Sequence, residues 1–346
     1  MTTNQRRVTA VGFLGTLVIL SGILYLVGIE DLLRVLSRAD TGLVVLVGAV
    51  TVGWLTAWAL GLRTVLAVLG VRLSVVRSFL VLNGAIFSNN VTPFGQAGGE
   101  PVAALLISKV AETEYERGLA AIASVDTINF LPSITLALIG AAYFATEITF
   151  SQRLRVATGL VVGLAAVVPA LIYLGWRNRD AVEQRLESVL TPLVQRLTKV
   201  LPGISPPDDS DVKSRIEGFF VAIERIATNR RGIVLTLTAS TLGWVLQMIA
   251  LWAAFWAIGT SIPFSVMLFV VPMGALASIT PLPGGTGGIE TVLVAILASL
   301  PSIAIGLETA LAAVVIFRGF VYWIPILIGG FVVSWVGVDA FGTTAS

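Results

Sequence analysis

Long apolar stretches, separated by short polar segments, run through most of this chain of 346 residues. Most have about the length that an α-helix needs to cross the roughly 30 Å hydrocarbon core of a bilayer, but two are longer and are interrupted near their centres. The pattern predicts an all-α polytopic membrane protein with about six transmembrane helices and two re-entrant helical hairpins. The stretches are Val8–Gly28, Thr41–Leu62, Val75–Val110, Gly118–Ala145, Val156–Gly175, Gly232–Gly259, Phe264–Leu300 and Glu308–Gly337.

The two interruptions have similar sequences, TPFGQAGGE at Thr92–Glu100 and TPLPGGTGGIE at Thr280–Glu290. Glycine and proline leave backbone N–H and C=O groups without helical partners, and each such group is costly in hydrocarbon. Broken backbone is tolerated there only where protein or water surrounds it. Two such breaks in corresponding positions of two halves predict a transport site near the middle of the membrane.

The breaks divide a single membrane domain, residues 1–346, into two similar halves. A first repeat covers residues 41–145 with a hairpin at 75–110, and a second covers residues 232–337 with a hairpin at 264–300. Between them lies a polar linker, residues 176–231, whose segment Asp180–Val200 has the apolar spacing of a short amphipathic helix. We expect a proline-rich connector and a second helix to follow.

Positive charge predicts the orientation, because lysine and arginine resist translocation. The segment Arg177–Arg231 holds 10 of the 22 basic residues and is expected in the cytoplasm, together with the N-terminus. The first hairpin is flanked by Arg77 and Arg117 and would enter from the cytoplasm. The second hairpin lacks basic flanks and would enter from outside, giving a pseudo-two-fold inverted repeat in a multi-pass protein of the cell membrane. Arg153 and Arg155, placed outside, do not fit this topology.

Composition removes several classes of function. Hydrophobic residues make up 56% of the chain and charged residues 12%, against about 25% charged in soluble domains. The net charge of +2 gives no basis for nucleic-acid binding, and the absence of cysteine and histidine excludes thiol, haem and zinc chemistry built on those residues. We therefore expect no metal and no cofactor. The N-terminal apolar stretch is long enough to be a retained first helix rather than a signal peptide.

Both breaks place glycines and a carboxylate around a helix start. In the first, Pro93–Gly99 is expected to form the turn and Glu100-Pro101 to open the next helix. Exposed N–H groups at such a start bind phosphate or carboxylate. The alternative is structural: the glycines permit close packing, and each glutamate satisfies its own helix. The candidate binding residues are Asn90, Gly98, Gly99, Glu100, Gly284, Gly285, Gly287, Gly288 and Glu290.

A second correspondence lies on the helix that follows each hairpin. Asp126 in SVDTINFLP and Arg318 in FRGFVYWIP follow Glu100 and Glu290 at similar spacings, each shortly before a proline. The two opposite charges could pair with each other across the pseudo-symmetry axis. Alternatively, Arg318 binds an anionic head group while Asp126 or a glutamate modulates it, so that Asp126 and Arg318 join the candidate substrate-binding residues. A purely structural buried pair is the third possibility.

These motifs resemble the lysylphosphatidylglycerol synthase transmembrane, or flippase-like (UPF0104-type), membrane family from about Thr41 to Gly337. The resemblance implies a lipid flippase and no enzyme activity, because no segment resembles the soluble aminoacyl-transferring domain of the bifunctional synthases. Gln96 departs from the pattern, since a small residue is expected there. The resemblance extends to Asn90, Gly95, Gly98, Gly99, Glu100, Pro283, Gly284, Gly285, Gly287, Glu290 and Arg318.

We therefore expect a flippase for an anionic lipid or lipid-linked sugar. Its substrate would be a polyprenyl- or dolichyl-phosphate sugar for surface-glycan or N-glycan assembly, or an aminoacyl-phospholipid. Enzymes of glycan or lipid synthesis are the expected partners.

Neither break ends in the Gly-Lys-Ser/Thr of a phosphate-binding nucleotide loop, so ATP would not drive the movement. The alternative is a secondary transporter of a small anionic solute or ion. A membrane-embedded enzyme has little support, because the acids are too scattered to form an acid–base pair.

Overall fold

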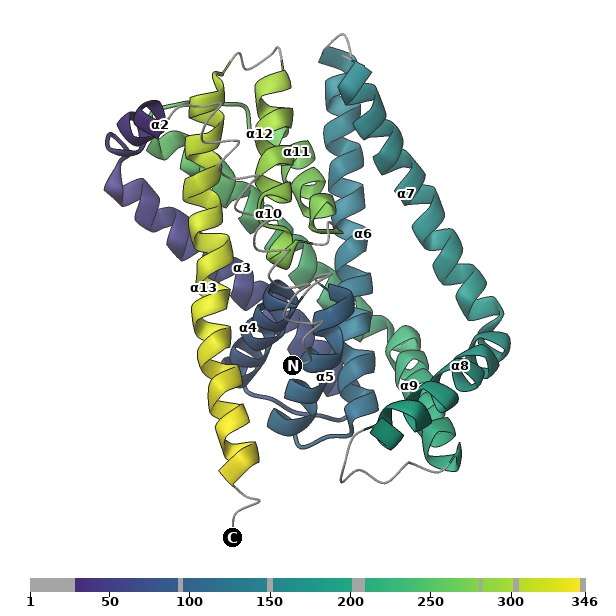
Figure 1. Cartoon of the computed structure of the whole chain (residues 1–346). Helices are drawn as coiled ribbons and strands as arrows, with labels where there is room; N and C mark the ends of the chain where they lie inside the picture. The colour runs from purple at the N-terminus through teal and green to yellow at the C-terminus, as the bar shows by residue number, and fades with distance from the viewer. Residues whose placement is uncertain are drawn as a thin grey trace.

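The computed structural model describes residues 29–92, 96–147, 152–200, 209–279, 282–300 and 305–342, and these are helical with short connections and no strand (Figure 1). The first predicted span, Val8–Gly28, lies outside the described residues. The helices are α2 (Ile29–Leu36), α3 (Thr41–Val68), α4 (Val75–Val91), α5 (Gln96–Val110), α6 (Tyr115–Glu147), α7 (Gln152–Arg177), α8 (Arg179–Val200), α9 (Asp209–Thr228), α10 (Arg230–Ala257), α11 (Ser265–Leu276), α12 (Gly288–Ser299) and α13 (Leu307–Gly342).

Four of the described helices, α3, α6, α10 and α13, are long and apolar enough to cross a membrane. Even the shortest, α3 and α10, have 28 residues, about 42 Å at 1.5 Å per residue, which exceeds a hydrocarbon core of roughly 30 Å. In α7 the apolar part is shorter, Val162–Arg177. The described residues thus confirm the all-α class and place a candidate membrane helix at four of the predicted spans.

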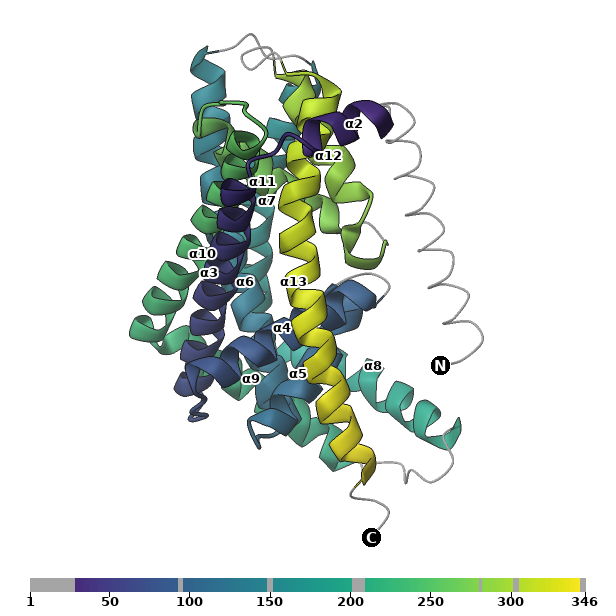
Figure 2. The same cartoon turned by 90° about the vertical axis from the view of Figure 1, so that its left-hand side faces the viewer.

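Helices α3 and α10 pack against each other along their lengths (Figure 2). Each begins at a residue that caps it: Asp40 Oδ1 accepts from the Leu43 N–H at 2.9 Å, and Asn229 Oδ1 accepts from the Gly232 N–H at 2.7 Å. The Trp58 indole of α3 packs on Gly243 of α10, where a side chain would occupy its place. The two halves of the chain are therefore joined by a close helix pair.

Both predicted interruptions are breaks between short helices. The first separates α4 from α5, which pack together, and the second separates α11 from α12. Between α11 and α12 lie two 3₁₀ turns, η1 (Ala277–Ile279) and η2 (Pro283–Gly285). In both views the pair α4–α5 lies in the lower half of the molecule and α11–α12 in the upper half (Figures 1 and 2).

One predicted helix boundary is wrong. Glu100-Pro101 does not open α5, because the helix already begins at Gln96 and Pro101 lies inside it. Proline lacks the N–H that would bond the carbonyl four residues earlier. That carbonyl belongs to Ala97, only one residue after the start of the helix, so the loss is confined to its first turn. Glycines 98 and 99 are consequently helical residues.

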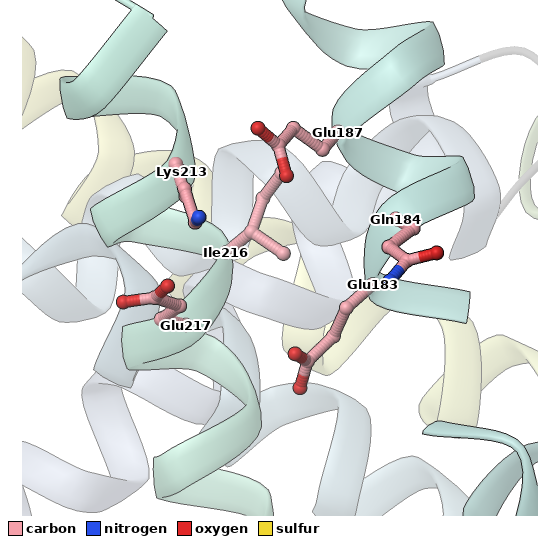
Figure 3. A pocket seen from close by; sticks show the side chains of 6 residues that line it. All are labelled: Glu183, Gln184, Glu187, Lys213, Ile216 and Glu217. Carbon is pink, nitrogen blue, oxygen red and sulfur yellow. The ribbon is translucent and has the colours of Figure 1, made fainter. Parts of the chain in front are cut away.

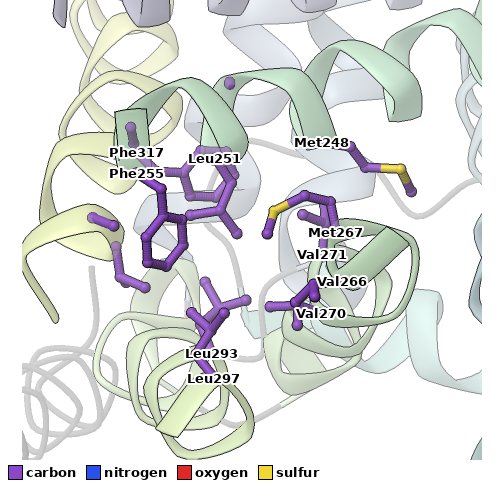
Figure 4. Close-up of a cluster of buried hydrophobic side chains, with 14 of the residues drawn as sticks. Met248, Leu251, Phe255, Val266, Met267, Val270, Val271, Leu293, Leu297 and Phe317 are labelled. Atoms are coloured by element: carbon purple, nitrogen blue, oxygen red, sulfur yellow. The ribbon is translucent and has the colours of Figure 1, made fainter. Parts of the chain in front are cut away.

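A buried apolar cluster supports the second break (Figure 4). Side chains of α10, α11, α12 and α13 point toward one another in it, among them Phe255, Met267, Leu293 and Phe317. Phe317 is next to Arg318 on α13, so its burial fixes the rotation of the helix that carries the arginine. A second cluster joins α3, α4, α5 and α6 around the first break. Each break is thus held by its own core.

The polar linker contains the two helices expected from its sequence, α8 and α9. Helix α9 packs on α6, where Arg215 and Glu116 form an ion pair at 2.9 Å. Between α8 and α9 is an open hollow of about 200 Å³ lined mainly by charged and amide side chains (Figure 3). The lining residues are Glu183, Gln184, Glu187, Lys213, Ile216 and Glu217.

Candidate functional site

The second break owes its shape to glycine. Gly284 and Gly285 have φ 61° and Gly287 has φ 86°, in the left-handed region that side chains disfavour. At Gly284 a Cβ would also lie 2.6 Å from the Tyr322 ring. Gly288 differs, because it is the first residue of α12 and has no positive φ. Three of the four predicted glycines are therefore required by the backbone itself.

Glu290 links the start of α12 to α13. One carboxylate oxygen, Oε2, accepts from the Gly287 N–H at 2.7 Å, as an acid in a first helical turn commonly does. The other, Oε1, accepts from Arg318 Nε at 2.7 Å. The side chains of Glu290 and Arg318 are only 10% and 11% exposed. The Gly287 amide is consequently taken by the protein's own carboxylate.

Arg318 makes two further contacts. Its Nη2 donates to the Gly284 carbonyl at 3.4 Å, and its guanidinium carbon lies 5.3 Å from the centre of the Tyr322 ring. A cation over an aromatic face is stabilised by the ring's negative face. The sequence reading missed Tyr322, although it lies four residues after Arg318 and so on the same face of the helix.

The first break is closed by contact between backbones. Gly99 of α5 lies so close to the backbone of Asn89 in α4 that a Cβ there would collide with it. The Asn89 side-chain oxygen is buried and has no hydrogen-bond partner among the described residues. The glycine here is needed for close approach and not for a left-handed backbone, since its φ is not positive. Gly95 lies outside the described residues. The structure describes Gln96 and Gly98 only as residues of α5, without their surroundings.

Glu100 of α5 and Asp126 of α6 face each other within hydrogen-bonding reach. The Asp126 Oδ2 atom is buried and has no donor among the described residues. Of the three possibilities for Asp126 and Arg318, pairing with each other is contradicted, because Arg318 is paired with Glu290. Each of these residues contacts the glutamate of its own half, because each follows that glutamate on the next long helix along the chain.

The two breaks meet at Asn90. A Cβ at Gly284 would lie 3.0 Å from the Asn90 side-chain oxygen, and α4 packs on the η2 turn. Gly284 is also the residue whose carbonyl accepts from Arg318. The contact therefore brings together one residue from the end of α4, the η2 turn, and two side chains of α13. We call Asn90, Gly284, Arg318 and Tyr322 the junction.

Similar proteins fall into one group. A model of the lysylphosphatidylglycerol synthase TM region matches residues 10–329. A UPF0104 membrane protein of Methanothermobacter thermautotrophicus is 30% identical over 334 residues, which cover 94% of this chain and 92% of the relative. One of Pyrococcus horikoshii is 26% identical, with 90% and 92% covered. One of Methanocaldococcus jannaschii is 24% identical, with 88% and 87% covered.

Proposed function

We propose that this chain, which belongs to the family of the lysylphosphatidylglycerol synthase TM region, is a lipid flippase. Its substrate is an anionic lipid or lipid-linked sugar: a polyprenyl- or dolichyl-phosphate sugar for surface-glycan or N-glycan assembly, or an aminoacyl-phospholipid. The observation that carries this proposal is the position of Arg318, a cation held by Glu290 where the two helix breaks meet. The candidate site is the junction together with the helix starts beside it.

Arg318 has N–H groups beyond those that bond to Glu290 and Gly284. A guanidinium has five N–H groups in a planar fork that fits phosphate oxygens in pairs. Glu290 accepts from Nε and Gly284 from Nη2, and neither hydrogen bond uses Nη1. Anchoring one side of the fork in this way orients the other side. A phosphate at the junction would be bound by Nη1 and by the Asn90 amide.

Glu290 also lowers the cost of keeping the Arg318 cation at membrane depth. An unpaired cation at membrane depth is costly, and a paired carboxylate removes the net charge. An arriving phosphate competes with Glu290 for the same guanidinium. Binding then exchanges one anionic partner for another, so the head group can leave as well as enter. The acyl or isoprenoid chains remain in the bilayer beside the helices.

The proposed topology follows the charge distribution. The pairs α4–α5 and α11–α12 are re-entrant hairpins that enter from opposite membrane faces, which their positions in the lower and upper halves support. The linker at residues 176–231 and the N-terminus lie in the cytoplasm of a multi-pass protein in the cell membrane. The protein moves its substrate without a covalent change, and enzymes of glycan or lipid synthesis deliver or consume that substrate.

Proteoliposomes test the proposal. We expect the purified protein to move fluorescent polyprenyl-phosphate sugar or aminoacyl-phospholipid between leaflets, measured by quenching of the outer leaflet. The double variant Arg318→Gln/Glu290→Gln should lower the rate at least tenfold, because it removes the cation and its anchor together. Mass spectrometry of the lipid should show no covalent change.

The matched control is the double variant Arg117→Gln/Glu114→Gln. These residues also form an arginine–glutamate pair, at 3.2 Å, but the side chains are 46% and 66% exposed. The control should keep the wild-type rate. Unchanged translocation in the Arg318 and Glu290 variant would overturn the site, and uptake of radiolabelled small anions without lipid movement would replace the flippase by a solute transporter.

A further inference from the structure

We propose that Glu100 and Asp126 form a proton-binding site, and that the proton moves with the anionic head group. The coupling rests on the proposed function, whereas the proton site itself does not. The two carboxyl groups come from neighbouring helices, α5 and α6, and face each other at the first break. This pair occupies the place that Glu290 and Arg318 occupy in the second half.

One oxygen of the pair lacks a donor among the described residues. Ionised carboxylates only accept hydrogen bonds, so two of them can bond to each other only through a proton carried by one. The Asp126 Oδ2 atom is buried, and no N–H or O–H of the described residues reaches it. Two negative charges within hydrogen-bonding reach, one of them with a buried oxygen, repel each other. A single shared proton both supplies the missing donor and removes one of the charges.

Among the side chains that the structure describes on the surrounding helices, no basic group replaces the proton. The helices packed on α6 are α3, α5, α7, α9, α10 and α11. Helix α11 has no ionisable residue, and the charged side chain that acts on Asp126 is Glu100. Arg318, on α13, is bonded to Glu290. The basic side chains whose exposure is described on the helices around α6 are exposed: Arg63, Lys109, Arg177, Lys213, Arg215, Arg225, Arg230 and Arg231.

The carboxyl pair is close in the chain to the junction. Gly99, next to Glu100, contacts Asn89, and the following residue, Asn90, contacts Gly284. A phosphate bound at the junction adds negative charge near the pair and so favours its protonated state. Coupling between two binding sites is reciprocal, so the proton equally favours the phosphate. The proton and the anionic head group therefore bind together and cross in the same direction.

Infrared spectroscopy of the purified protein tests the proton site without transport. We expect the carbonyl band of a protonated carboxyl group at neutral pH in the wild type. The double variant Glu100→Gln/Asp126→Asn should lose the band, and the variant Glu114→Gln, which changes an exposed carboxylate, should keep it. A wild type without this band, or a double variant that retains it, would overturn the site.

Proteoliposomes containing a pH-sensitive dye test the coupling. In the wild type, translocation of labelled polyprenyl-phosphate sugar should accelerate under an inward proton gradient and acidify the lumen. Asp126→Asn should abolish both the response to the gradient and the acidification of the lumen, because the amide cannot release a proton. Wild-type translocation that is indifferent to the gradient would refute the coupling alone. A wild type that moves no lipid would instead refute the proposed function, and the infrared result would still decide the proton site.

Discussion

In the first half Glu100 faces the carboxyl group of Asp126, whereas in the second half Glu290 is bonded to the guanidinium of Arg318. Both glutamates lie near the start of a short helix, and both partners lie on the long helix that follows. The same order of helices therefore carries opposite electrostatics. One half holds a cation beside a carboxylate, and the other holds two acids. The two corresponding positions, Asp126 and Arg318, therefore differ in chemistry while their place after a break is the same.

The largest expected effect comes from breaking the ion pair. Arg318→Gln leaves Glu290 buried without its cation, and removing one partner of a buried pair costs about 3–5 kcal/mol. The free energy of unfolding in mixed detergent micelles would measure this loss. The control removes an arginine from an exposed pair: Arg117→Gln should change the free energy of unfolding by about 1 kcal/mol or less.

The double variant Arg318→Gln/Glu290→Gln sharpens the same test. Glutamine at position 290 keeps an oxygen that can accept from the Gly287 N–H, so the start of α12 stays capped. Because no charge is left buried alone, the double variant should recover part of the stability lost in Arg318→Gln. A double variant that loses the sum of the two single effects would show that the two side chains do not act as a pair.

The next largest loss of stability is expected at Gly99, the glycine that permits close approach of α4 and α5. Gly99→Ala introduces a methyl group against the backbone of Asn89, which cannot move aside as a side chain can. Overpacking of this kind costs about 1–3 kcal/mol, and we expect the upper end of that range. Gly159→Ala on α7, where nothing lies within 4 Å, is the control and should not destabilise. Equal unfolding free energies for the two variants would contradict the close approach of α4 and α5.

A smaller loss is expected from Gly284→Ala in the second break. Its φ of 61° disfavours a side chain by about 1–2 kcal/mol, and the methyl group must also displace the Tyr322 ring. Gly319→Ala, on α13 with open space around it, is the matched control and should be neutral or stabilising. If both substitutions gave the same melting temperature, the left-handed turn would not be required for stability.

The smallest effect on stability should come from Asp126→Asn. The amide has nearly the same size and can donate to Glu100, as the shared proton does in the wild type. We expect the free energy of unfolding to change by about 1 kcal/mol or less, the size of one neutral hydrogen bond. Arg318→Gln, at the corresponding position of the other half, should cost several times more. A comparable loss in both variants would mean that Asp126 stabilises the fold as Arg318 does.

Much of the fold could be predicted from local pattern. Apolar length indicated the four long helices, glycine and proline indicated both breaks, and leucine spacing indicated α8. These signals lie within one segment, so a single sequence contains them. The start of α5 could not be predicted in the same way, because Pro101 is tolerated in an early turn as well as at a helix start.

The partners within the candidate site could be predicted only in part. The similar spacings from Glu100 to Asp126 and from Glu290 to Arg318 indicated that Asp126 and Arg318 occupy equivalent places in the two halves. They did not indicate that each glutamate would contact the next helix of its own half. The contact of Asn90 with Gly284 joins segments far apart in the chain. Such contacts depend on the rotation and depth of whole helices, which are set by packing in clusters such as that around Phe317.

The close packing of α3 on α10 has a mechanical consequence. One helix belongs to each half, and Trp58 of α3 fits against Gly243 while its indole N–H donates to the Ser240 carbonyl at 3.4 Å. Sliding or parting these helices would break contacts along their whole length. The close pair α3–α10 therefore resists relative movement of the two halves along its whole length.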